Sequence, residues 1–289
     1  GADFLEQDVV LTKDDQAIVL HDIHLEAVTD VEQQFPDRTR DDGHWYAIDF
    51  TLDEIKLLRI HERTRHNSEQ ALFVRRFPVG KPTFQIRTLA EEIELVQGLN
   101  KTTGRSTGIY PEIKKPAWHR SQKKDISQIV LNVLRHYEYD SAQSKVFVQC
   151  FDANELKRLR YELRTRLKLV QLIGENDWND VSTTDFRHMI SADGVAQVAS
   201  YAQGIGPSLN HLIVKDESGQ YVVGPLVKWA RDNGLQVHPF THRSDALPEF
   251  VNTEKQLFHF LVAAQVDGVF SDFPDRARKF WDEANKDTH

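Results

Sequence analysis

The chain has 289 residues, of which 40% are hydrophobic and 28% charged, a composition typical of a globular protein and not of a disordered or membrane one. Its formal net charge of -8 disfavours nucleic acid as the main partner, because phosphate backbones are held by clustered Lys and Arg. The single cysteine, Cys150, excludes an internal disulfide framework and Cys-rich zinc sites. No apolar run approaches the roughly 18 to 20 residues that span a bilayer, so we expect no stable membrane insertion.

Short runs rich in β-branched and aromatic residues alternate along the chain with segments of helical periodicity. The predicted strands are FLEQDVV, AIVLHD, GIYPEIK, KVFVQCFD, LKLVQLIG, GIGP, LQVHPF and GVFSDF, and the predicted helices are 88–100, 125–137, 153–166, 193–203, 221–234 and 253–265. Asp152 or Asn154 is placed to cap helix 153–166, and Gly98 and Gly234 are placed to end helices. The alternation predicts parallel βαβ units, and therefore a barrel or a doubly wound sheet.

Polar side chains gather at the C-terminal ends of these strands, which favours a (β/α)₈ TIM barrel, since this fold builds its active site there. They are Glu6, Asp8, His21, Glu112, Lys114, Gln149, Asp152, Gln171, His238 and Asp272. Neither GxGxxG nor a Walker A pattern, which would favour an open sheet, occurs. With AIVLHD counted as a hairpin-like continuation of the first strand, the barrel has only seven strands. We predict one domain, 1–289, with the long polar segment 23–87 inserted after the second strand.

Three carboxylates and a lysine are predicted to converge at the mouth of this barrel. The period of two puts Glu6 and Asp8 on one face of their strand, about 6 to 7 Å apart, and does the same for Glu112 and Lys114. Converging carboxylates repel one another unless a hard divalent cation neutralises them, and ligation by oxygen alone favours Ca²⁺ or Mg²⁺ over zinc. One such acid could instead pair with a buried Lys or Arg, but the three together with Lys114 favour the metal.

The histidines offer one candidate acid or base. His21 ends an apolar strand, where a histidine that titrates near neutrality can move protons, although a lone strand-end histidine is more often structural. His238 also ends a strand, and there a hydrogen-bonded core role is favoured over ligand contact. The remaining candidates are expected to lie in surface loops: His24, His44, His61 and His119.

The order of motifs in this sequence resembles the glycerophosphodiester phosphodiesterase family, in particular its longer bacterial, often periplasmic form that hydrolyses deacylated phospholipids. The resemblance rests on GADFLEQDVVLTKDDQAIVLHD, followed by IYPEIK, VQCFD, VHPFTHRSD and DGVFSDFPD, and it covers essentially the whole chain. The order of E-x-D, LHD and PEIK at these spacings is highly specific.

The resemblance implies a role for each matching residue. The metal ligands of the family fall on Glu6, Asp8 and Glu112, with Ca²⁺ expected and Mg²⁺ as the alternative. The catalytic residues fall on His21 and on Lys114, which faces the phosphate. The substrate contacts fall on Gln149, Phe151, His238 and Phe240; Phe240 precedes Thr241 where many members carry Trp before Thr.

One part of the family pattern has no counterpart in this sequence. The family begins with a strand ending in His-Arg-Gly, followed by a helix, upstream of the E-x-D strand. We therefore expect a barrel that lacks its first β-α unit, and with it the second catalytic histidine and a phosphate-binding arginine. Such a barrel would expose unpaired strand edges, which favours a sequence cut from a larger gene product over natural loss.

The resemblance implies metal-dependent hydrolysis of glycerophosphodiesters to glycerol 3-phosphate and an alcohol, by two-histidine acid/base catalysis through a cyclic phosphate, in the complete protein. A phospholipase acting on intact lipid or sphingomyelin, and a binding protein on the same barrel without catalysis, remain alternatives. The expected partners are small-molecule glycerophosphodiesters, and the expected location is periplasmic or extracellular. The sequence does not determine the oligomeric state and is compatible with a homodimer.

Overall fold

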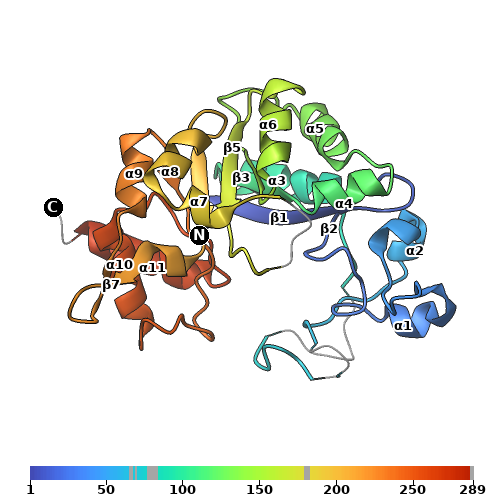
Figure 1. The fold of residues 1–289 in the computed structure, drawn as a ribbon. Helices are drawn as coiled ribbons and strands as arrows, with labels where there is room; N and C mark the ends of the chain where they lie inside the picture. Colours follow the sequence, from blue (N-terminus) through green and yellow to red (C-terminus); the bar gives the residue numbers. More distant parts are fainter. Residues whose placement is uncertain (65–67, 69, 77–83, 179–182, 287–289) are drawn as a thin grey trace. The chain divides into compact units, whose positions relative to one another are not determined.

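The computed structural model describes residues 1–64, 68, 70–76, 84–178 and 183–286, whose elements are shown in Figure 1. They form two compact units: an N-terminal unit, Glu6–Asp140, and a C-terminal unit, Gly1–Leu5 with Ser141–His289. The predicted insertion 23–87 belongs to the N-terminal unit, and its residues 65–67, 69 and 77–83 lie outside the described residues. Its assignment to one domain with the rest of the chain stays a prediction.

In the N-terminal unit β1 (Phe4–Leu11) lies between β2 (Ala17–Val19) and β3 (Gly108–Ile113). β1 and β2 pair antiparallel with Val10 opposite Ile18, so AIVLHD is indeed a hairpin continuation of the first strand. The helices are α1 (Val31–Gln34), η1 (Pro36–Arg38), η2 (Ala47–Asp49), α2 (Leu52–Ile55), α3 (Leu89–Thr103), α4 (Pro116–Ser121) and α5 (Ile126–His136). α3 ends at Gly104, which has a positive φ of 68°. The prediction of Gly98 as its end is wrong, because Gly98 lies inside the helix.

In the C-terminal unit four strands pair parallel in the order β4 (Phe147–Cys150), β5 (Lys168–Ile173), β6 (Gly204–Pro207) and β9 (Gln236–Val237). β7 (Ile213–Lys215) and β8 (Tyr221–Val223) form a separate antiparallel pair. The helices are α6 (Ala153–Tyr161), α7 (Phe186–Met189), α8 (Ala192–Val198), η3 (Leu209–Leu212), α9 (Leu226–Asp232), α10 (Glu254–Ala264) and α11 (Pro274–Lys286). No helix in the described part of the chain is both long and apolar enough to cross a membrane.

The described chain has an α/β fold whose sheet strands are mostly parallel, as the alternating pattern predicts. Asp152 caps α6 by accepting the N–H groups of Asn154 and Glu155, and Gly234 has a φ of +72° just after α9, both as predicted. Two predicted elements are wrong. GVFSDF forms only an isolated bridge, from Ser271 to His242, and the start of segment 221–234 is strand β8.

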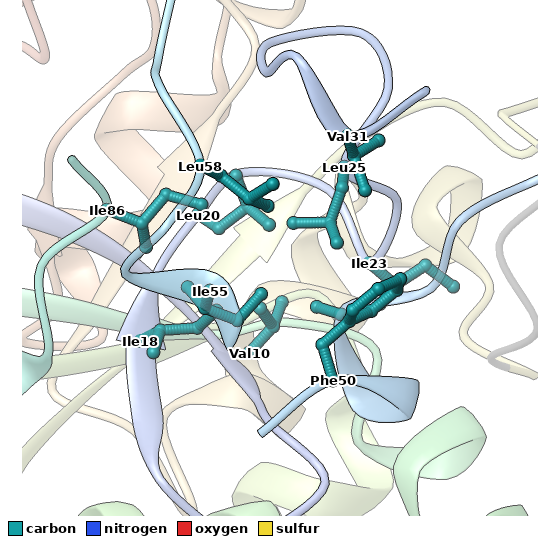
Figure 2. Packing of buried hydrophobic residues seen from close by; sticks show 11 residues of the cluster. Val10, Ile18, Leu20, Ile23, Leu25, Val31, Phe50, Ile55, Leu58 and Ile86 are labelled. Atoms are coloured by element: carbon teal, nitrogen blue, oxygen red, sulfur yellow. The ribbon is translucent and has the colours of Figure 1, made fainter. Parts of the chain in front are cut away.

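A hydrophobic core inside the N-terminal unit anchors the predicted insertion (Figure 2). Val10 and Ile18 come from β1 and β2, whereas Leu25, Phe50 and Leu58 come from the insertion, and all five side chains are fully buried. Ile23 and Leu25 both point into this core. Because successive side chains of an extended segment alternate, residues 24 and 26 lie on the opposite face.

Two adjacent leucines give a matched test of this core. Leu58 is fully buried, whereas Leu57 is 64% exposed. We expect Leu58→Ala to lower the free energy of unfolding by about 2 to 5 kcal/mol through lost burial and the cavity left behind. Leu57→Ala is expected to change it by less than about 0.5 kcal/mol. Urea denaturation of both variants measures this, and equal effects would contradict the described packing.

Candidate active site

Three carboxylates lie together in the N-terminal unit and form the carboxylate cluster: Glu6 and Asp8 from β1 and Glu112 from β3. One oxygen of each lies within 4.8 Å of the others. The strands bring them together as predicted, since alternate residues of β1 share a face and β3 is the neighbour of β1. The Lys114 ammonium joins them, 2.9 Å from Glu112 Oε1 and 3.3 Å from Asp8 Oδ1.

Burial and charge set the protonation of this cluster. Burial raises the pKa of Glu112 to about 7, with the charge of Asp8 adding to it and the Lys114 ammonium opposing it. Burial also acts to raise the pKa of Asp8, but Lys114 and His21 outweigh it and hold that pKa below its ordinary value. Although burial opposes it, the two carboxylates raise the pKa of Lys114 well above its ordinary value. One ammonium therefore serves the half-buried carboxylate of Asp8 and the buried carboxyl group of Glu112, and Glu112 has the higher pKa of the two.

This donor set fits a hard divalent cation. Its ligand atoms are all carboxylate oxygens, the kind that Ca²⁺ and Mg²⁺ prefer. Three carboxyl groups face the single ammonium of Lys114, so the cluster carries more negative charge than Lys114 balances whenever more than one of them is ionised. A dication supplies the missing positive charge.

His21 follows β2 and is 59% exposed at its side chain. The backbone N–H of Leu20 donates to the carbonyl of Asp8 at 2.8 Å, which holds the end of β2 beside the carboxylate cluster. His21 Nδ1 lies 2.6 Å from Asp22 Oδ1, and the other Asp22 oxygen pairs with Arg63. Although burial opposes it, the bonds to His21 and Arg63 push the pKa of Asp22 far below its ordinary value. Asp22 is thus a fixed carboxylate that orients the imidazole, and the sequence analysis missed this role.

The four predicted substrate contacts belong to the C-terminal unit. Gln149 is buried in β4, and Phe151 follows that strand. The Phe151 ring contacts Phe240 at 5.7 Å, and Trp178 lies 6.0 Å from Phe151 and 6.3 Å from Phe240 between ring centroids. The three rings make an aromatic wall, in which Trp178 is half exposed.

His238 packs edge-to-face on Phe147, with ring centroids 5.3 Å apart. Burial lowers the pKa of His238 to about 4, so its imidazole is neutral near neutrality.

The surface position predicted for His119 is wrong. Its side chain is fully buried, with Nε2 accepting the N–H of Leu11 at 3.3 Å and Nδ1 bonded to the carbonyl of Lys115 at 3.1 Å. Burial lowers its pKa to about 4. Helix α4 follows β3 directly and carries His119 under β1, so this histidine has a structural role.

His24, His44 and His61 are half-buried instead of lying on the surface as predicted. His24 and His44 form with Glu26 a second group of candidate metal ligands, the histidine cluster. Burial is the main cause that lowers the pKa of His24. The H-x-E spacing of His24 and Glu26 is the only local signal for this cluster in the sequence.

The chain matches the family model of the Glycerophosphoryl diester phosphodiesterase family over residues 1–276. It is 42% identical to a glycerophosphodiester phosphodiesterase of Haemophilus influenzae, over 96% of this chain and 82% of that protein. It is 38% identical to one of Treponema pallidum, over 97% of this chain and 84% of that protein.

Solved structures of the same family share the fold. A phosphodiesterase of Oleispira antarctica, in complex with the product sn-glycerol-3-phosphate, aligns with a TM-score of 0.61 at 17% identity, over 98% of this chain and 86% of that one. A glycerophosphodiester phosphodiesterase of Thermotoga maritima aligns with a TM-score of 0.53 at 18% identity, over 94% and 82%. These neighbours are TIM-barrel enzymes, which confirms the predicted fold class.

This chain has a barrel-type α/β fold, with carboxylates clustered on the neighbouring strands β1 and β3 and a lysine beside them. It is an enzyme, a phosphoric diester hydrolase. The chain is a member of the glycerophosphoryl diester phosphodiesterase family, as its motifs indicate.

The raised pKa of Glu112 predicts how the metal-free protein responds to pH. The folded pKa of about 7 exceeds the ordinary value of 4.5, so the contribution of Glu112 to stability is full below pH 4.5 and is lost as the pH rises through 7. In chelator at pH 8, Glu112→Gln should therefore be more stable than the wild type by about 2 to 3 kcal/mol, and the difference should shrink to about 1 kcal/mol or less near pH 5.

The buried histidines also make stability depend on pH, with the opposite sign, because their pKa values are lowered. Their contribution is the same in both proteins, so it cancels when the two free energies of unfolding are subtracted. Thermal melts in chelator from pH 5 to 8 measure the difference. A wild type that is equally or more stable than Glu112→Gln at pH 8 would contradict the described burial of this charge.

Proposed function

We propose that this protein hydrolyses glycerophosphodiesters to glycerol 3-phosphate and an alcohol in a metal-dependent reaction centred on the carboxylate cluster and His21. The observation that carries the proposal is the convergence of Glu6 and Asp8 of β1 with Glu112 of β3 and the following Lys114, in a chain of this family. The glycerol 3-phosphate bound by the Oleispira antarctica relative supports the class of product.

Glu6, Asp8 and Glu112 would hold the cation, with Ca²⁺ first and Mg²⁺ second, because their donors are all oxygen. When bound, such a cation neutralises phosphate charge and lowers the pKa of a glycerol hydroxyl. Lys114 adds a positive charge at the same cluster, from which it stabilises the charge that develops on the phosphate oxygens.

His21 moves one of the two protons of the reaction. The glycerol 2-hydroxyl loses a proton and attacks phosphorus, the departing alcohol gains a proton, and water then opens the cyclic phosphate. The exposed His21 imidazole is accessible to a substrate, and Asp22 fixes its orientation through Nδ1, which leaves Nε2 to face the reacting group. The family assigns the second proton to another histidine, the one of the His-Arg-Gly motif.

The substrate contacts of Gln149, Phe151, His238 and Phe240 are part of the proposal on the strength of the family motif. Export to the periplasm is proposed as well, from the same resemblance, and the sequence is compatible with a homodimer. Cell fractionation and light scattering test these two points separately from the activity.

The function is tested on the protein produced from its full coding sequence, by a coupled assay that detects glycerol 3-phosphate. We expect turnover of glycerophosphocholine that chelator abolishes and Ca²⁺ or Mg²⁺ restores, and none by Glu112→Gln at any metal concentration. Hydrolysis that is insensitive to chelator would refute the metal dependence. Preference for sphingomyelin or intact phospholipid would favour the phospholipase alternative, and binding of glycerophosphocholine without turnover would favour a binding protein.

A second test concerns Asp22 as a positioning residue. Asp22→Asn removes the charge that orients His21, so kcat should fall about 10- to 100-fold with KM nearly unchanged. Asp22→Glu should recover part of the loss. Asp53, an exposed acid in α2, provides the control, and Asp53→Asn should leave both constants alone. A fall in kcat/KM that comes entirely from KM would argue that Asp22 only contacts substrate.

A further inference from the structure

The histidine cluster is carried by a short two-stranded ribbon inside the insertion. His24 bridges antiparallel to Tyr46, the N–H of Leu25 donates to the carbonyl of Trp45 at 2.9 Å, and the N–H of Ala47 donates to that of Ile23 at 2.9 Å. Continuing this register by two residues puts Glu26 opposite His44. His24 then lies diagonally across from His44, within reach on the same face.

The two faces of the ribbon differ in character. Ile23 and Leu25 pack into the core of Figure 2, and Trp45 packs against it. His24, Glu26 and His44 lie on the other face, because successive side chains alternate. The buried face fixes the register, so the three polar side chains are held together by the packing behind them.

The ligand atoms of the cluster are close enough for one ion. One atom each of His24, Glu26 and His44 lies within 4.8 Å of the others. The two imidazoles stack with centroids 4.3 Å apart and planes 9° from parallel. Nε2 of His24 is buried and has no hydrogen-bond partner among the described residues, an arrangement that costs free energy unless something binds it.

Other contacts hold the ligands in place. Glu26 accepts the backbone N–H of Trp45 through Oε2 at 3.2 Å, and its Oε1 lies 2.6 Å from His44 Nδ1. Asp42 accepts the backbone N–H of His44 at 3.1 Å and the hydroxyl of Tyr46 at 2.8 Å. The Tyr46 ring packs edge-on against His24 at 4.5 Å. Metal ligands in proteins are typically oriented by such outer contacts.

We propose that His24, Glu26 and His44 bind a borderline transition-metal dication, Zn²⁺ in the first place, at a site separate from the carboxylate cluster. Two imidazoles and one carboxylate are a donor set that suits zinc, whereas three carboxylates suit Ca²⁺ or Mg²⁺. Three protein ligands leave a fourth position of the tetrahedron for water or an anion. The ion would clamp residues 24–26 to residue 44 within the insertion.

The test titrates the purified, chelator-treated protein with Zn²⁺ against a chromophoric competitor, in the presence of saturating Ca²⁺. We expect one equivalent of Zn²⁺ to bind, and His24→Ala or His44→Ala to weaken it at least about 100-fold, since even outer contacts are worth 10- to 100-fold. His61→Ala changes another half-buried histidine of the insertion and should leave zinc binding unchanged.

Two further measurements keep the proposal falsifiable if a variant folds poorly. Glu112→Gln should retain zinc binding, and the zinc-edge X-ray absorption of the wild type should show two imidazole ligands. Absence of zinc binding to the wild type, loss of it in Glu112→Gln with retention in His24→Ala, or an edge spectrum with oxygen ligands alone would each overturn the proposal.

Discussion

The interaction on which the site depends is the sharing of one ammonium group, that of Lys114, between the half-buried carboxylate of Asp8 and the buried carboxyl group of Glu112. Buried charges are tolerated only when they are paired, and one positive charge cannot balance two acids and the nearby Glu6. Burial, with the charge of Asp8 adding to it, raises the pKa of Glu112 to about 7, so ionising this group costs free energy in the folded protein. β1 and β3 thus hold together a group of side chains that has too little positive charge. A group of this kind favours a divalent cation over a neutral ligand.

The same rule of alternation builds both clusters of the N-terminal unit. In β1 it places Glu6 and Asp8 on one face and the buried Val9 on the other. In the insertion it places His24 and Glu26 on one face with Ile23 and Leu25 in the core. In the insertion, apolar packing behind the ribbon holds the polar groups in front of it. In β1 the face opposite the carboxylates is mixed, with exposed Leu5, buried polar Gln7 and buried Val9.

What the sequence predicts well is what a single strand or helix determines by itself. The pairing of Glu6 with Asp8, and the cap at Asp152, follow from local spacing, and the structure reproduces both. His119 was assigned wrongly because its burial depends on where α4 packs, which no local pattern encodes. The histidine cluster escaped prediction for a similar reason: only the register that pairs His24 with Tyr46 brings His44, far along the chain, beside Glu26. GVFSDF has the composition of a strand, but its backbone forms only an isolated bridge, since strand composition does not specify a partner.

Asp22 interacts with two histidines, His21 beside the carboxylate cluster and His24 in the histidine cluster. It bonds to His21, pairs with Arg63, and its charge also acts on His24, three residues further along the chain than His21. Because the hydrogen bonds of Asp22 hold its pKa far below the ordinary value, its charge is constant across the physiological range. This fixed negative charge orients the imidazole of His21 and acts to raise the pKa of His24 against the lowering effect of burial. A change at Asp22 is therefore expected to affect both histidines, although the ligands of the two clusters are distinct.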